Sequence, residues 1–293
     1  MGLTEFEAKR ALAEKSASRA HCVELLQLIR REKMRAPRAV ATFGKVLIDK
    51  HSWGLGNELW NVYEQVFIAA LDLHDDELAE ALKDKFPGSS RVARLEGMQL
   101  EQRGEYAKAE ALYAEVLEEN PANMLVAKRK IAVLKAQKRT HDVIAALNDF
   151  LRSFGTDLSA WTELAETYLS LGAFRYASFC YEELVLLNPM DAIYHSRLAD
   201  IYSTLGGLDN LRTARKHYSH SIELNKQQNL RAYLGLVACT KAIASHRNYR
   251  ADQDDNGLNE RLLQFALDFL QQFYASQATP ELAEVAQRAL SSF

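Results

Sequence analysis

Apolar side chains recur three and four residues apart along most of the chain, and short polar stretches separate the apolar-periodic segments. This spacing places the apolar side chains on one face of a helix, so it predicts helices rather than strands. Towards the two ends, helices are expected at about residues 4–15, 20–33, 37–50, 229–245, 258–275 and 280–291, with a polar loop at 246–257. The pattern predicts an all-α fold.

Helix-breaking residues recur with a fixed period in the central part of the chain. Pro87, Pro121 and Pro189 are separated by 34 and 68 residues, and Gly155 occupies the missing middle station. A period of 34 residues with two helices per repeat is typical of the tetratricopeptide repeat. The sequence therefore predicts an α-solenoid of tetratricopeptide type.

The best-formed repeat covers residues 158–191. Its landmark residues, three and four apart on two successive helices, are Trp161, Leu164, Tyr168, Ala177, Tyr181 and Pro189. Repeat 90–123 keeps the corresponding Gly97, Ala109, Tyr113 and Pro121. Small residues at these stations let paired helices approach closely, and the aromatic residues are expected to fill the gaps between repeats.

The other repeats match the pattern less evenly. Repeat 124–157 is degenerate, and 56–89 is a divergent first repeat. Repeat 192–225 contains three additional residues around Gly207-Leu208-Asp209, which are expected to widen its turn. The predicted organisation is an N-terminal helical cap at 1–55, repeats at 56–225 and a C-terminal helical region at 226–293, since terminal repeats are commonly atypical.

Composition and charge limit the kinds of partner. The chain has 293 residues with only 13 Gly and 5 Pro, which disfavours folds that need many tight turns. A net charge of −3 provides no overall basic field for nucleic acid, and no apolar run is long enough to cross a membrane. The first residues lack the apolar segment of a secretory signal, and three widely spaced cysteines form no disulfide framework. We therefore expect a reduced protein on the cytosolic side, without nucleic-acid partners or a membrane span.

Candidate catalytic and metal-binding motifs are incomplete. Asp252 to Gly257 resembles the start of an EF-hand loop, but Leu263 occupies the twelfth position, where calcium needs a bidentate Glu. His217 and His220 are three residues apart, as two zinc ligands could be, yet no further ligand pair has metal-site spacing, which favours exposed helix histidines. Cys180 is expected to be a buried, inert thiol. No catalytic signature is present, so we expect no enzymatic activity, cofactor or metal.

The first helix of each repeat is expected to line a groove that binds partners. In repeats 90–123 and 124–157 the groove positions are mostly basic, and the candidate partner-binding residues are Arg91, Arg94, Lys128, Arg129, Lys130 and Lys135. These cations are suited to an acidic segment of a partner, and a merely solvated helix face is the alternative. The asparagines with which tetratricopeptide co-chaperones bind a C-terminal carboxylate are replaced by Met98, Ala132 and Glu163, which disfavours that function.

Several long segments resemble a particular tetratricopeptide family. Residues 59–73, 86–99, 128–138, 177–190 and 204–219, including the inserted Gly-Gly turn, are similar to subunit 2 of the ER membrane protein complex. The resemblance implies a non-catalytic cytosolic scaffold in an assembly that inserts tail-anchored and some multi-pass membrane proteins. It further implies docking on cytosolic segments of membrane-embedded subunits and on a soluble subunit with a metalloprotease-like fold. The chain would then lie at the cytoplasmic face of the endoplasmic reticulum, held there by its partners.

Two other functions remain open from the sequence. A freestanding tetratricopeptide adaptor that binds short peptide segments would share the repeats but would behave as a stable monomer. A helical enzyme is a more remote alternative, and it would require a tightly bound metal or cofactor. The stoichiometry of any complex, and the face of the solenoid that meets each partner, are not encoded in the repeat pattern.

Overall fold

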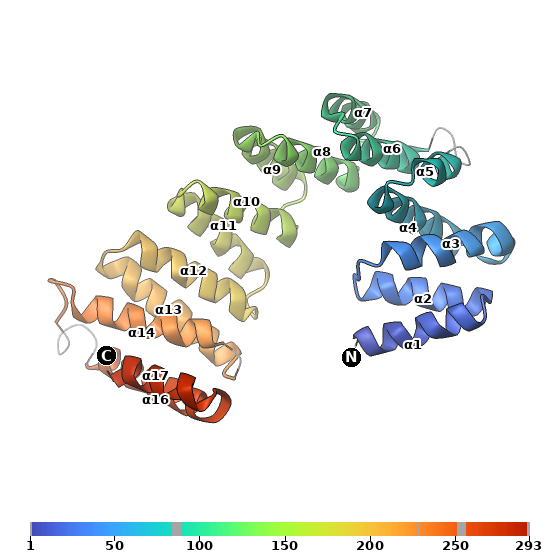
Figure 1. The fold of residues 1–293 in the computed structure, drawn as a ribbon. Helices are drawn as coiled ribbons and strands as arrows, with labels where there is room; N and C mark the ends of the chain where they lie inside the picture. The colour runs from blue at the N-terminus through green and yellow to red at the C-terminus, as the bar shows by residue number, and fades with distance from the viewer. Residues whose placement is uncertain (1, 84–88, 228, 251–255, 292–293) are drawn as a thin grey trace. The chain divides into compact units, whose positions relative to one another are not determined.

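The computed structural model of the chain describes residues 2–83, 89–227, 229–250 and 256–291. Within these ranges it consists of helices and connecting turns without a strand, which confirms the predicted all-α fold (Figure 1). The chain divides into two compact units, Met1–Arg139 (the N-terminal unit) and Thr140–Phe293 (the C-terminal unit). Pro87 and Asp252 to Asp255, on which two of the expectations above depend, lie outside the described residues.

The N-terminal unit begins with the three helices expected from the apolar periodicity. Its elements are α1 (Gly2–Lys15), α2 (Arg19–Arg31), α3 (Pro37–His51), the short 3₁₀ helix η1 (Ser52–Gly54), α4 (Glu58–Leu73), α5 (Asp76–Lys83), α6 (Ser90–Gln102), α7 (Tyr106–Glu119) and α8 (Met124–Ala136). One apolar core extends from α1 to α6, with Leu25, Leu47 and Phe67 among its fully buried side chains. A smaller core surrounds Tyr113 where α6, α7 and α8 meet. The first core crosses residue 55, so the proposed N-terminal cap packs continuously with the helices that follow it.

The C-terminal unit has the same build from successive helix pairs. Its helices are α9 (Thr140–Ser153), α10 (Leu158–Ser170), α11 (Phe174–Leu187), α12 (Ala192–Leu205), α13 (Leu208–Leu224), α14 (Leu230–Ala244), α16 (Leu258–Gln277) and α17 (Pro280–Ser291). Asp157 and Asp191 begin α10 and α12 by accepting hydrogen bonds from backbone N–H groups of the first turn. A continuous apolar core extends from α12 to α17 around Leu236 and Leu270.

The turn within each repeat shows the 34-residue period in the backbone itself. Gly104, Lys138, Gly172 and Gly206 are each 34 residues apart, and all four have a positive φ between 58° and 75°. Glycine adopts this left-handed conformation without steric cost, and it occupies three of the four stations. The turn between the paired helices is therefore the same in four consecutive repeats, including the degenerate repeat 124–157.

The small-residue stations of the repeats lie where paired helices are closest. Ala109, Ala177 and Ala214 are completely buried, one in each of α7, α11 and α13. A larger side chain at these positions would separate the helices, so the sequence spacing correctly identified the packing face. The periodic turns and these alanines together account for the tetratricopeptide geometry.

The three additional residues of repeat 192–225 do not widen its turn, contrary to the prediction. Only Gly206 and Gly207 separate α12 from α13, and α13 has 17 residues where α7 and α11 each have 14. Both glycines have a positive φ, of 69° and 81°, which reverses the chain within two residues. Leu208 then packs against the core at the first position of α13. The insertion therefore extends the helix, because an apolar residue placed directly after the glycine pair can be buried there.

Candidate functional site

The six predicted partner-binding cations all lie on the first helices of two repeats in the N-terminal unit. Arg91 and Arg94 lie on α6, and Lys128, Arg129, Lys130 and Lys135 lie on α8. Arg91 and Lys135 are exposed, whereas the other four are partly buried. The Arg91 guanidinium lies 5.6 Å from the centre of the Trp60 ring on α4, a cation–π contact. The set is therefore divided between surface charges and charges used inside the unit.

Two of the six cations form ion pairs that join helices of the unit. Arg94 Nη2 lies 2.5 Å from Glu64 Oε1 on α4, and the Arg94 side chain is only 11% exposed. Arg129 on α8 binds the Glu101 carboxylate of α6 with two nitrogens, Nε at 3.0 Å from Oε1 and Nη2 on Oε2. Such bidentate pairs fix geometry as well as charge. The basic cluster at residues 128–130 thus contains one arginine whose charge is already balanced by an internal carboxylate.

Glu101 also accepts a hydrogen bond from a buried tyrosine. The Tyr113 hydroxyl on α7 donates to Glu101 Oε1 at 2.5 Å, and the Tyr113 side chain is completely buried. Burial and the adjacent Glu101 carboxylate raise the pKa of the Tyr113 hydroxyl, so it remains a donor. Burial alone would lower the pKa of Arg129, but its hydrogen bonds and charge interaction with Glu101 outweigh this and raise it. Tyr113, Glu101 and Arg129 form a triad that connects three successive helices.

The same arrangement occurs in the C-terminal unit. Tyr218 on α13 donates to Asp200 Oδ1 on α12 at 2.7 Å, and Arg231 on α14 binds Oδ2 of the same carboxylate at 2.8 Å. Tyr181 on α11 likewise donates to Glu166 on α10 at 2.7 Å. In the degenerate repeat 124–157, the station equivalent to Tyr113 is Leu147. The acids that sequence analysis assigned to the groove therefore hold neighbouring helices together.

A histidine pair that sequence analysis did not identify lies between α12 and α13. His217 was expected to be exposed, but it is partly buried and stacks on the buried His195, with 5.3 Å between ring centroids. His195 Nε2 lies 3.0 Å from the Pro189 carbonyl oxygen and must donate to it, so Nδ1 is the acceptor in the neutral ring. His217 Nδ1 lies 3.0 Å from His195 Nδ1 and must carry the donated proton. Only His220, whose ring edge meets His195, is exposed as predicted.

This pair predicts a loss of stability in mild acid. Burial, together with the positive charges that His195, His220 and Lys216 can carry, lowers the pKa of His217 to about 4, and burial also lowers that of His195. An unfolded histidine has a pKa of about 6.5, so the unfolded chain binds more protons between about pH 6.5 and 4, and stability falls as the pH falls through that window. Between pH 7.5 and 5 the His217→Gln variant is expected to lose about 1–2 kcal/mol less of its unfolding free energy than the unaltered chain, allowing for solvent screening. Urea unfolding at both pH values measures this, with exposed His141→Gln as the control, and equal losses in all three proteins would contradict it.

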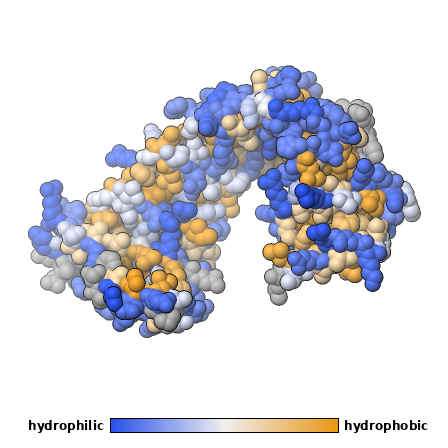
Figure 2. Space-filling view, in the orientation of Figure 1, coloured by the Kyte–Doolittle hydropathy of each residue, from blue (hydrophilic) through white to orange (hydrophobic). Residues whose placement is uncertain are grey.

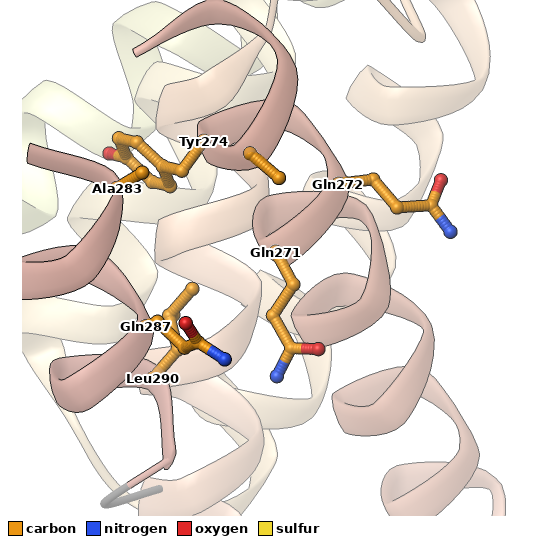
Figure 3. Close-up of a pocket in the computed structure, with 7 residues that line it drawn as sticks. Gln271, Gln272, Tyr274, Ala283, Gln287 and Leu290 are labelled. Carbon is orange, nitrogen blue, oxygen red and sulfur yellow. The ribbon is translucent and has the colours of Figure 1, made fainter. Parts of the chain in front are cut away.

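Other features of the described residues provide little for catalysis. No three or more His, Cys, Asp and Glu side chains in the described ranges are grouped so that they could hold a metal ion. Burial raises the pKa of the Cys180 thiol to about 12, as expected for an unreactive cysteine. A cavity of about 310 Å³ between α16 and α17 is lined by Gln271, Gln272 and Gln287 with Tyr274 and Leu290, and offers amides rather than acid–base groups (Figure 3). None of the helices described is both long and apolar enough to span a bilayer.

Comparison with known proteins identifies the family. The family described as the EMC2 TPR-like repeat domain matches residues 82–208. ER membrane protein complex subunit 2-A of Xenopus laevis is 41% identical over 221 residues, which are 74% of this chain and 74% of that protein. The chain belongs to the family of ER membrane protein complex subunit 2.

More distant similarities agree with this family and with its fold. ER membrane protein complex subunit 2 of Dictyostelium discoideum is 32% identical over 208 residues, covering 69% of this chain and 65% of that protein. Among solved structures, the C-terminal part of a TPR repeat-containing protein from Cytophaga hutchinsonii aligns with a TM-score of 0.54 at 14% identity. That alignment covers 96% of this chain and 98% of the solved one. At that identity the structural match shows the tetratricopeptide solenoid fold alone, and the assignment to the subunit 2 family rests on the sequence relatives.

Proposed function

We propose that this chain is a non-catalytic scaffold subunit of the ER membrane protein complex, in which it supports the insertion of tail-anchored and multi-pass membrane proteins. The observation that carries the proposal is the 41% identity over 221 residues with a relative named as subunit 2 of that complex. The organisation of the chain supports a binding role, because its buried polar chemistry is used in triads between helices rather than gathered around a reactive centre.

The proposal includes a place and partners for the chain. It would lie at the cytoplasmic face of the endoplasmic reticulum membrane, held there by other subunits. The partners proposed are cytosolic segments of membrane-embedded subunits and a soluble subunit with a metalloprotease-like fold. A permanent assembly of this kind typically buries more than about 2,000 Å² at each subunit interface, with an apolar centre.

Affinity purification from detergent-solubilised membranes tests the proposal. The tagged chain should retain several endoplasmic reticulum membrane proteins in fixed ratio through a salt wash, as measured by quantitative mass spectrometry. Recovery as a monomer with a soluble chaperone or signalling protein, and absence from the membrane fraction, would favour the freestanding adaptor instead.

The surface cations of α6 and α8 give a sharper prediction within the proposed complex. Arg91→Glu, Lys130→Glu and Lys135→Glu together should reduce recovery of at least one partner about tenfold, since like charges would then face an acidic partner segment. Arg129 is left unchanged, because reversing it would place two negative charges against each other inside the unit. The measurement is co-purification, with thermal unfolding to show that the fold is retained.

A matched charge reversal controls for the change in net charge. Arg38, Lys45 and Lys50 are exposed cations on α3, outside the predicted surface. Reversing these three should leave recovery of every partner unchanged. If both triple variants bind equally well, the cations of α6 and α8 have no role in assembly.

A further inference from the structure

Apolar side chains form a continuous exposed stripe on α11. Tyr176, Phe179, Leu186 and Leu187 are exposed on the side of α11 opposite its buried face, and the exposed Met190 and Ile193 follow at the turn into α12. We call these six residues the α11 stripe. Leu186 and Met190 are each 74% exposed, and Figure 2 shows hydrophobic surface over this part of the C-terminal unit. Soluble chains seldom leave so many large apolar side chains together in water.

The stripe has the spacing of a helix-binding seam. Residues 176, 179, 183, 186, 190 and 193 follow one another at alternating intervals of three and four, and the third of them is Glu183. On α11 this spacing places residues 176 to 187 along one face. An α-helix laid along such a face inserts its own side chains between them. The stripe is therefore apolar except for one carboxylate near its centre.

Aromatic contacts hold the exposed rings in place. Tyr176 stacks on Tyr168 of α10 with 5.2 Å between ring centroids. Phe179 meets Trp161 of α10 edge to face at 6.0 Å. Rings fixed in this way lose little conformational entropy when a partner binds, which favours affinity.

The exposed area of the stripe is sufficient for a specific interface. The exposed fractions of the six side chains correspond to a surface on the order of 800 Å², about one partner's share of a standard protein–protein interface. The largest apolar patch on a typical monomeric protein is about 300–600 Å². This comparison indicates that the stripe is covered when the protein functions.

The charge at the centre of the stripe decides between possible occupants. In a symmetric dimer the central residue of the contact meets its own copy, so two Glu183 carboxylates would face each other. An anionic lipid surface would likewise repel Glu183. We propose that the α11 stripe binds an amphipathic helix of a partner protein, with apolar residues three and four apart and a Lys or Arg opposite Glu183. The proposal rests on the scaffold function only in that it requires a partner protein.

Photo-crosslinking in the intact cell tests the proposal directly. The photoreactive residue p-benzoylphenylalanine is placed in the full-length chain in place of Phe179 or, separately, Leu186, and crosslinked peptides are identified by mass spectrometry. Both positions should crosslink to a single helical segment of one protein, with the predicted apolar spacing and a basic residue in register with Glu183. Crosslinks to a second copy of the chain, to lipid or to no protein would overturn the proposal.

Substitutions measure how much the stripe contributes. Leu186→Glu with Met190→Glu should reduce recovery of the crosslinked partner at least tenfold, and Glu183→Lys should also weaken it. Leu282→Glu with Val285→Glu is the matched control, since both residues are exposed on α17 in the same unit. If the unaltered chain retains endoplasmic reticulum subunits but the stripe variant retains them all equally, only the proposal for the stripe fails. Loss of every such subunit from the unaltered chain would instead refute the scaffold function.

Discussion

Replacing Glu101 with alanine is expected to destabilise the N-terminal unit by about 3 kcal/mol. The substitution leaves the buried Tyr113 hydroxyl without its acceptor and removes the carboxylate that balances the half-buried Arg129 guanidinium. Leaving a buried polar group unsatisfied costs about 1–3 kcal/mol, and breaking a buried ion pair by removing one partner costs about 3–5 kcal/mol. The lower part of the combined range applies because the Arg129 side chain is one-third exposed and water can partly solvate it.

Urea unfolding at neutral pH measures this effect, and two further variants divide it. Tyr113→Phe removes only the hydroxyl and retains the ion pair, so a loss of about 1 kcal/mol is expected. Glu101→Gln can still accept from Tyr113 but no longer balances Arg129, and should lie between the two. A Glu101→Ala protein no less stable than Tyr113→Phe would show that the ion pair contributes nothing to the fold.

The repeat architecture was predictable because it depends on short-range patterns. A helix pair needs apolar residues at spacings of three and four, a small residue at the closest approach and a turn that reverses the chain. Ala109 and Ala177 lie at the expected buried stations, and Gly104 and Gly172 form the expected turns. Each of these features is determined within a few residues of the position that shows it, so a single sequence is sufficient.

The polar contacts between helices were not predictable from the same patterns. Tyr113 follows its acid by 12 residues, Tyr181 by 15 and Tyr218 by 18, so no fixed spacing marks the pairs. An acid on the inner face of a first helix has the same sequence signature whether a tyrosine or a binding partner covers it. Only the packing of the second helix distinguishes the two cases, and it changed Glu101 from a groove residue into a structural one.

The histidine pair and the insertion escaped prediction for a related reason. His195 and His217 are 22 residues apart on different helices, and only the crossing of α12 and α13 brings their rings together. The three additional residues near Gly207 could lengthen either the turn or the helix. Burial of Leu208 against the core of the C-terminal unit decides in favour of the helix. In both cases the outcome depends on residues that are distant in the sequence.

Gly97→Val is expected to destabilise the N-terminal unit by about 3 kcal/mol. A Cβ atom at this position would lie 2.2 Å from Cε1 of the Tyr113 ring, far inside van der Waals contact. The ring is completely buried and its hydroxyl is held by Glu101, one helical turn beyond Gly97 on α6, so it cannot move aside cheaply. Overpacking of a filled core costs typically about 1–3 kcal/mol, and valine adds two methyl groups beyond the clashing Cβ.

A compensating substitution distinguishes this steric cause from a change in helix propensity. Tyr113→Leu removes the ring edge that Cβ would strike, and on its own it should destabilise the unit through the lost packing and hydroxyl. In the Gly97→Val background the same change should cost nothing or restore stability, giving a coupling energy of at least about 1 kcal/mol in a double-mutant cycle. Additive losses in urea unfolding would mean that valine acts through the helix backbone and that the glycine has no packing role. A measured coupling would show that Gly97 is retained so that the tyrosine ring can lie flat on α6 and place its hydroxyl at Glu101.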